Sequence, residues 1–344
     1  MVEALLYDQL NNQSVRCNTC QRRCIIEEGN WGYCRTRINS KGKLYSMAYG
    51  EVSRSSVSVI ERKPIYHFFP GSKIYNLGTI GCNFLCPGCQ NWEISFARNE
   101  NLNIATSYQS PQQVIEVVKK NDCCGISFTY NEPTMWLEYV HDVSKLAREE
   151  QLFTSFITNG YLTSEALDTI APFLNMFRVD LKSFNQSGYE KIAHISDWEG
   201  ILDILIRAKH KWHLHLEIVT NLIPGYNCNL DQCKKVAQWI QSELGKETPW
   251  HLTRFNPQWQ LENVPQTPVN LLEKARKIAM GEGLDFVYIG NVSEHASNHT
   301  YCPNCAKILI KRPHFNLVEC FLNNNRCPWC GETIYGQFKS NKKQ

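Results

Sequence analysis

The chain has 344 residues, 43% of them hydrophobic, and its 36 basic and 33 acidic side chains leave a net charge of only +3. This near-neutral balance gives little reason to expect a dedicated nucleic-acid or anionic-membrane surface, so neither kind of partner is expected. No apolar run approaches the roughly 20 residues of a membrane span, and the start lacks a signal peptide's basic region and long apolar core, so we expect a cytoplasmic protein.

The sequence holds sixteen cysteines, an unusually high number. In a reducing cytosol, clustered thiols bind metal or carry out redox chemistry more often than they form disulfides. Three groups stand out: Cys17, Cys20 and Cys24 with Cys34; Cys82, Cys86 and Cys89; and Cys302 and Cys305 with Cys327 and Cys330. Four others show no ligand spacing and are expected to be small core residues: Cys123, Cys124, Cys228 and Cys233.

The first group lies in a cysteine-rich N-terminal extension, residues 1–70. Its C-x2-C-x3-C-x9-C spacing is a weaker metal signal than the other two groups give. These four thiols would hold zinc or an auxiliary iron–sulfur cluster that passes electrons inward. An unliganded, cysteine-rich loop is the alternative.

From residue 72 onward, strand-like and helix-like segments alternate. Strands are predicted at 72–79, 125–130, 153–158, 176–182, 213–220, 250–255 and 285–290. Helices are predicted at 111–120, 133–149, 164–171, 198–210, 230–244 and 269–281. Such alternation predicts a parallel sheet, either doubly wound or in a full or partial TIM-like barrel, with the active site at the carboxyl ends of the strands.

The motif GCNFLCPGC follows the first of these strands and carries Cys82, Cys86 and Cys89. Three thiolates on one short loop suit a [4Fe-4S] cluster whose fourth iron has no protein ligand. A zinc site completed from elsewhere in the chain is the alternative.

This C-x3-C-x2-C motif resembles the signature of the radical SAM superfamily. The resemblance implies an α/β fold, a partial TIM-like (β/α)6 barrel over residues 71–294, and a [4Fe-4S] cluster on the three cysteines. It also implies that S-adenosylmethionine (SAM) binds the fourth iron and is cleaved reductively to methionine and a 5′-deoxyadenosyl radical. That radical would abstract hydrogen from a substrate that the sequence does not name.

Polar residues at the ends of later strands extend the resemblance. Asn131 and Glu132 stand where the family carries its SAM-ammonium motif, although a helix start explains them as well. Asn159, in Thr-Asn-Gly, and the pair Asp180 and Lys182 resemble segments of glycyl-radical-enzyme activases such as the pyruvate formate-lyase activating enzyme. A turn and a salt bridge are the alternatives for these three residues.

Two further positions concern the cofactor. His251, on the sixth strand, would reach the adenosine or the substrate, with a core histidine as the alternative. Gly88 stands where the family usually has an aromatic residue that packs near the adenine. Trp92 is a hypothetical replacement for that apolar surface.

Within the superfamily, the chain is similar over nearly its whole length to the radical SAM enzyme of the AmmeMemoRadiSam system. The similar blocks are CNTCQRRC…GYC, KPIYHFFPG, GTIGCNFLCPGCQNWEIS, TYNEPT, VDLKSF and FVYIGNV. The resemblance implies a reductant such as flavodoxin or ferredoxin and association with Memo-like and AMMECR-like proteins. Two other functions stay open: an activase that installs a glycyl radical on a partner, and a non-catalytic metal-binding adaptor.

The last cysteine group forms two knuckles, YCPNC and RCPWCGE, in residues 295–335. Two C-x2-C pairs are a strong signal for zinc held by four thiolates. A rubredoxin-like iron or a second iron–sulfur cluster is the alternative. The segment is therefore expected to be a zinc-ribbon-like module, followed by a disordered tail, residues 336–344.

Overall fold

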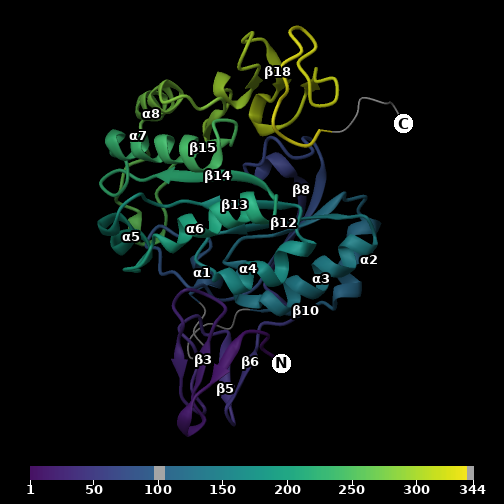
Figure 1. Cartoon of the computed structure of the whole chain (residues 1–344), viewed down its shortest axis with the longest axis vertical. Coiled ribbons are helices and arrows are strands. Elements are labelled where there is room, and N and C mark those ends of the chain that lie inside the picture. The colour runs from purple at the N-terminus through teal and green to yellow at the C-terminus, as the bar shows by residue number, and fades with distance from the viewer. Residues whose placement is uncertain (97–104, 339–344) are drawn as a thin grey trace.

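The computed structural model describes residues 1–96 and 105–338 (Figure 1). At its centre is an eight-stranded open sheet in the order β16-β15-β14-β13-β12-β11-β9-β8. Its strands are β8 (Arg54–Val59), β9 (Lys73–Gly78), β11 (Gly125–Phe128), β12 (Phe153–Thr158), β13 (Met176–Asp180), β14 (His215–Leu222), β15 (Trp250–Arg254) and β16 (Val287–Gly290). All neighbouring pairs are parallel except β8 with β9. The predicted α/β class with a central parallel sheet is confirmed.

Helices connect the parallel strands and cover the sheet. They are α2 (Pro111–Lys120), α3 (Leu137–Glu149), α4 (Ser164–Ile170), α5 (Gln186–Ala193), α6 (Gly200–Ile206), α7 (Leu230–Trp239) and α8 (Val269–Gly281). The start of α2 shows why the local prediction works, because the Ser110 side chain accepts a hydrogen bond from the Gln113 backbone and Pro111 occupies the first turn. Its Val114, Ile115 and Val118 are buried on one face. Helix α5 was not predicted.

The N-terminal segment forms a small module of its own. Two three-stranded antiparallel sheets contain β1 (Val2–Glu3), β5 (Arg37–Ser40) and β6 (Lys43–Ser46), and β2 (Tyr7–Gln9), β3 (Val15–Cys17) and β4 (Ile25–Ile26). A further two-stranded sheet pairs β7 (Glu51–Val52) with β10 (Ser107–Tyr108). Strand β8, which falls within the extension expected at residues 1–70, belongs instead to the central sheet.

A buried ion pair fastens the N-terminal module to α3. The Arg37 guanidinium donates to both carboxylate oxygens of Glu138 at 2.9 and 3.0 Å, and the two side chains are only 2% and 5% exposed. Burial alone would raise the pKa of Glu138, but the charge and hydrogen bonds of Arg37 outweigh it and lower this pKa, so the carboxylate stays charged at neutral pH.

Replacing Arg37 with alanine is expected to lower the free energy of unfolding by about 3–5 kcal/mol, because it leaves the Glu138 charge buried without its partner. Chemical denaturation of the full chain measures the change. Arg23→Ala is the matched control, since Arg23 also bridges the module to the barrel but pairs with Glu165 where both side chains are more than 40% exposed. That substitution should lower the free energy of unfolding by at most about 1 kcal/mol. Equal losses in the two variants would contradict the assignment.

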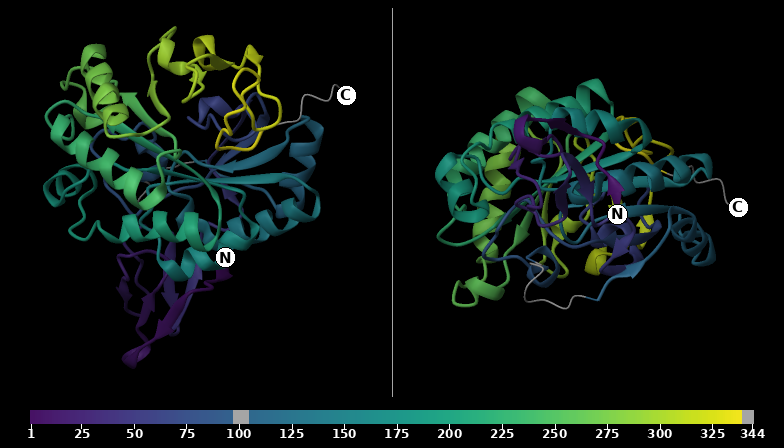
Figure 2. Two further views of the ribbon diagram at one scale, coloured as in Figure 1. Left: turned by 45° about the horizontal axis from the view of Figure 1, so that its top comes forward. Right: turned by 90° about the horizontal axis from the view of Figure 1, so that it is seen from below.

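The C-terminal module lies at the opposite end of the molecule from the N-terminal module (Figures 1 and 2). It contains β17 (Thr300–Tyr301), β18 (Ile308–Lys311) and β19 (Glu319–Cys320). Its small core joins Leu309, Ile310 and Leu322 to Tyr66 and Tyr288 of the barrel. The tail was expected to begin at residue 336, yet the Gln337 backbone hydrogen-bonds with residues 67 and 69; residues 339–344 lie outside the described chain.

A carboxylate inside the barrel holds the segment on which this module packs. Glu217, fully buried in β14, accepts hydrogen bonds from the backbone N–H groups of Tyr66 and His67 at 2.8–3.0 Å. His215 and His251 also contact its two oxygens, at 3.1 and 2.7 Å. The hydrogen bonds from these two histidines hold the pKa of Glu217 well below its ordinary value despite burial.

His67 should make the stability fall in mild acid. Its ring contacts the Tyr335 carbonyl and the Tyr288 hydroxyl, each at 2.6 Å, and burial lowers its pKa to about 3. Below about pH 6.5 the imidazole is protonated in the unfolded chain but stays neutral in the folded chain. His67 should therefore lower the free energy of unfolding by about 2 kcal/mol between pH 7 and pH 5. In denaturant titrations, His67→Gln should remove that part of the pH dependence, whereas His314→Gln, at an exposed position, should not. An unchanged pH slope in His67→Gln would contradict a buried neutral imidazole.

Among the described residues, no helix combines the length and apolar character needed to cross a bilayer.

Candidate functional site

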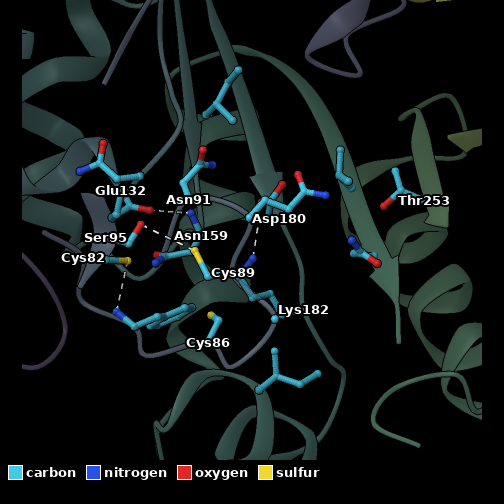
Figure 3. Close-up of a pocket in the computed structure, with 18 of the residues that line it drawn as sticks. Cys82, Cys86, Cys89, Asn91, Ser95, Glu132, Asn159, Asp180, Lys182 and Thr253 are labelled. Carbon is cyan, nitrogen blue, oxygen red and sulfur yellow. Dashed lines mark hydrogen bonds and ion pairs between the residues drawn. The ribbon is translucent and has the colours of Figure 1, made fainter. Parts of the chain in front are cut away.

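The loop after β9 brings three thiols to one cavity at the carboxyl ends of the parallel strands. The cavity has a volume of about 430 Å³, and Cys82, Cys86 and Cys89 line it. Residues at the ends of the following strands line it too: Asn131, Glu132, Asn159, Asp180, Lys182, Asn221 and Thr253. Figure 3 shows Cys82 near Glu132, and Cys86 and Cys89 nearer to Lys182 and Asp180. The structure thus brings together residues that the sequence places more than a hundred positions apart.

Polar groups hold two of these thiols. The Phe84 backbone N–H donates to Cys82 Sγ at 3.4 Å, and Cys89 Sγ lies 3.7 Å from the hydroxyl of Ser95, at the end of α1 (Trp92–Ser95). Burial raises the pKa of Cys86 to about 12, against the opposing effect of Lys182, and raises that of Cys82 well above its ordinary value. Such thiols become thiolates at neutral pH only when a metal replaces their protons.

Lys182 and Asp180 form the charged side of the cavity. Lys182 Nζ lies 3.5 Å from one Asp180 carboxylate oxygen, and Arg178 binds the other. Although burial favours its neutral form, the pKa of Lys182 is raised by Asp180 and by the thiols of Cys86 and Cys89. A permanent cation therefore stands beside the thiol loop, where it would balance negative charge.

The turn Asn131–Glu132 braces the loop as well as lining the cavity. Asn131 accepts from the Thr79 backbone at 3.1 Å and donates to the Gly81 carbonyl at 2.8 Å, just before Cys82. Glu132, rather than Asn131, caps the short 3-10 turn η3 (Pro133–Trp136) by accepting from Thr134. The helix-start explanation therefore applies to Glu132, and its carboxylate also lines the cavity.

Asn159 ties two loops together. Its backbone N–H donates to Glu132 Oε2 at 2.8 Å, and its side-chain amide donates to Asn83 Oδ1, in the thiol loop, at 2.7 Å. Its side-chain oxygen Oδ1 accepts a hydrogen bond from the Tyr161 backbone N–H at 2.9 Å. Because these protein partners occupy its amide, Asn159 orients the loop from within the cavity wall.

The absence of an aromatic side chain at Gly88 has a steric reason. A Cβ at this position would stand 3.0 Å from Leu261 Cδ1 and 3.3 Å from the Phe255 ring. These two residues belong to a small apolar cluster with Ile223 and Tyr226, and all of these except Phe255 line the cavity. Residues from the loops after β14 and β15 thus fill the space that an aromatic at position 88 would need.

Trp92 does not take over that role. Its ring stacks on Trp259, in the 3-10 turn η7 (Trp259–Leu261), with centroids 5.5 Å apart and an interplanar angle of 2°. Within the described residues, Trp92 is not part of the cavity lining. The apolar wall comes from Ile223, Tyr226 and Leu261 instead.

His251 also lies elsewhere. Its Nε2 lies 2.7 Å from Glu217 Oε2, its ring stacks on Tyr288 at 5.0 Å, and it does not line the cavity in the described chain. The sequence prediction that His251 contacts a cofactor therefore gains no support from this geometry. The core-histidine alternative describes its surroundings.

Three cavity residues escaped the sequence reasoning. Asn221 Oδ1 and Arg178 Nε are buried without a hydrogen-bond partner among the described residues, and both side chains line the cavity. Lys63 lines it from the segment before β9, and burial lowers its pKa to about 8. Unsatisfied polar atoms facing a cavity indicate a ligand. The sequence could not reveal these residues. Lys63 stands beside a proline, and Arg178 and Asn221 lie within strands, so none of them belongs to a local motif that indicates a ligand site.

The donors around the cavity fit a [4Fe-4S] cluster better than a single ion. Sulfurs around tetrahedral zinc stand about 3.8 Å apart, whereas the thiolates of a cubane each bind a different iron and stand further apart. The three loop thiols do not form a group with all ligand atoms within 4.8 Å, a spacing that only the C-terminal cysteines reach among the described residues. No fourth cysteine and no histidine line the cavity in the described chain, which leaves one iron of such a cluster for a ligand.

The C-terminal cysteines form a compact tetrathiol group. Sγ of Cys302 lies 3.5 Å from that of Cys330, Sγ of Cys305 lies 3.7 Å from that of Cys327, and all four lie within 4.8 Å of one another. These distances match the edge of a zinc–thiolate tetrahedron, about 3.8 Å. The N-terminal group, Cys17, Cys20, Cys24 and Cys34, lines a separate pocket.

Comparison with known proteins agrees with this arrangement. The family model of the radical SAM superfamily matches residues 77–240, which contain the thiol loop and the carboxyl ends of five of the parallel strands. An uncharacterized protein of Methanocaldococcus jannaschii is 40% identical over 337 residues, covering 97% of this chain and 99% of the relative. A protein of the same archaeon described as a glycyl-radical enzyme activating enzyme is 25% identical over 235 residues, covering 67% and 83% of the two chains.

The fold has a counterpart among solved structures. A radical SAM methyltransferase from Sphaerobacter thermophilus superposes with a TM-score of 0.50 at 13% identity, over 70% of this chain and 71% of that one. At this identity the likeness concerns the fold. Together with the family match and the cavity described above, it identifies this chain as a member of the radical SAM superfamily and a radical SAM enzyme.

Proposed function

We propose that Cys82, Cys86 and Cys89 hold a [4Fe-4S] cluster and that the chain uses it to cleave SAM. The observation that carries this proposal is the convergence of three thiols, without a fourth cysteine or a histidine among the described residues, on one strand-end cavity. When bound and reduced, such a cluster supplies the electron that cleaves the SAM sulfonium to methionine and a 5′-deoxyadenosyl radical. Family membership leaves the non-catalytic adaptor without support.

The protein residues would bind and orient SAM. Glu132 Oε2 accepts one hydrogen bond, from Asn159, and retains capacity for the SAM ammonium. The unsatisfied Asn221 Oδ1 offers a further acceptor, and Lys182 offers a cation for the carboxylate. Ile223, Tyr226 and Leu261 provide an apolar surface for the adenine and exclude water there.

An anaerobic assay tests this function. Protein purified without oxygen and loaded with iron and sulfide should form 5′-deoxyadenosine and methionine when it receives SAM and dithionite. Glu132→Gln should weaken SAM binding by roughly tenfold, as expected for a hydrogen bond between charged groups, while Glu93→Gln, at an exposed position, should not. Iron-loaded wild type that gives no 5′-deoxyadenosine would overturn the proposal.

The relatives favour one more specific function, a glycyl-radical enzyme activase. The relative described as an activating enzyme aligns with 67% of this chain at 25% identity, and the Asp180–Lys182 segment resembles that branch. An activase would leave a stable, protein-based EPR signal on a partner chain after mixing with SAM and reductant. Hydrogen abstraction from a small molecule without such a signal would favour an ordinary metabolite as substrate.

Partners follow from the same proposal. The cluster needs a low-potential electron donor, for which flavodoxin or ferredoxin is proposed. The whole-length resemblance to the AmmeMemoRadiSam enzyme adds Memo-like and AMMECR-like proteins as proposed associates. At the C-terminal cysteines we propose a structural zinc ion, because their spacing fits one ion.

A further inference from the structure

The N-terminal cysteines surround a pocket beside the thiol loop of Cys82, Cys86 and Cys89, the proposed catalytic loop, but do not have the spacing of a single-ion site. Cys17, Cys20, Cys24 and Cys34 all line this pocket. Among the described residues, no three of them bring their sulfurs within 4.8 Å of one another, whereas the C-terminal four do. The sulfur atoms are therefore too far apart to bind a single ion together. Such a spread suits a cubane cluster, in which each thiolate binds a different iron.

The pocket is built to hold a buried, negatively charged group. Cys17 and Cys20 are each only 7% exposed, and Ile26 and Met135 add apolar walls. Arg37 also lines the pocket and is 1% exposed. Its two terminal nitrogens bind Glu138, but its Nε has no hydrogen-bond partner among the described residues. A buried N–H group left over in this way indicates an acceptor within the pocket.

The pocket is also in direct contact with the catalytic loop. Arg22 Nε donates to the Asn83 carbonyl at 2.7 Å, and Asn83 itself lines the pocket. The Cys34 carbonyl comes so close to Gly81 that a Cβ there would stand 2.6 Å away, and the φ of Gly81 is +80°. Glycine at position 81 therefore lets the N-terminal cysteine loop reach the residue before Cys82.

The loop after β12 completes this junction. Cys20 forms a β-bridge with Leu162, and the Gln21 backbone donates to the Tyr161 carbonyl at 3.1 Å. Asn159, two residues earlier, binds Asn83. The N-terminal cysteines are thus anchored to the same two loops that shape the SAM cavity.

We propose that Cys17, Cys20, Cys24 and Cys34 hold a second [4Fe-4S] cluster, adjacent to the proposed catalytic one. All four irons of this cluster have a thiolate, so it has no open corner for a substrate. The N-terminal cysteines would bind this second cluster whether or not the chain cleaves SAM.

Metal analysis of the full chain tests this proposal. In the triple variant Cys82→Ala/Cys86→Ala/Cys89→Ala, reconstituted without oxygen, we expect about four irons and four sulfides per chain to remain. In Cys20→Ala/Cys24→Ala, the iron and sulfide bound by the N-terminal cysteines should disappear, and those bound by the catalytic loop should remain. The melting temperature of each variant, compared with that of wild type, reports whether the whole chain has folded.

The outcomes separate the two sites. Two zinc ions per chain and no sulfide in the triple variant would assign zinc to the N-terminal site and overturn the proposal. A triple variant that binds metal only at the C-terminal module would overturn it as well. Loss of all iron from Cys20→Ala/Cys24→Ala alone would instead argue against a cluster on the catalytic loop. In reduced wild type, the EPR signals of two clusters this close should be broadened by spin–spin coupling. Each variant should give a narrow, uncoupled signal, and a wild-type spectrum equal to the sum of the two variant spectra would contradict their adjacency.

Discussion

Cys86→Ala is expected to abolish 5′-deoxyadenosine formation. Among the residues that the structure describes, Cys86 supplies one of three thiols around the cavity, and the charge of Lys182 opposes the rise that burial causes in its pKa. Losing a partner that merely supports a metal ligand costs about 10–100-fold in activity or metal affinity, so losing a ligand should cost more than about a hundredfold. The assay compares wild type and variant with SAM and dithionite, and iron content is measured on the same samples.

Cys233→Ala is the matched control for this prediction. Cys233 is 3% exposed in α7 and packs in the barrel core, so its loss removes a buried thiol without touching the cavity. The control should keep its iron and its product formation. A Cys86→Ala variant that forms 5′-deoxyadenosine at the wild-type rate would contradict the ligand assignment, whatever the total iron content of the chain.

The sequence predicted the regular parts of this molecule because their signals are local. Helix α2 begins at Pro111, as predicted, since a capping serine and a proline specify that start within a few residues. Parallel strands end at one edge of the sheet, so residues after β9, β11, β12 and β13 could be expected in one site. By contrast, Ser187 and Gly188 in α5 look like a turn, and the helix there depends on packing that its own sequence does not reveal.

What the sequence could not predict depends on contacts between distant segments. The wall beside Gly88 comes from Phe255 and Leu261, more than 160 positions away. The strand that contains Arg178 is buried on both faces, so alternation could not tell which side chains face the cavity. His251 could be expected either in the site or in the core, and its contact with Glu217 follows from the pairing of β14 with β15.

The second large effect is expected at the proposed zinc site, where Cys327→Ser should unfold the C-terminal module. A structural zinc ion contributes about 10 kcal/mol or more to the folding of a small thiolate module, which exceeds what the short strands β17, β18 and β19 would supply alone. We expect the loss of one zinc per chain and a change in the fluorescence of Trp329, whose ring contacts Phe321 in the folded module. Cys320→Ser is the control, because Cys320 lies in the same module outside the tetrathiol group.

The consequences should extend into the barrel, because the module covers part of its core. Arg312, fully buried, donates to the Tyr66 carbonyl at 2.6 Å and to the Thr300 hydroxyl at 2.7 Å. Tyr66 in turn belongs to the segment that Glu217 holds. When the module unfolds, this segment loses the contacts that the module gives it, so the melting temperature of the whole chain should fall together with the zinc content. A Cys327→Ser variant that loses its zinc yet melts like wild type would show that the metal binds there without stabilising the fold.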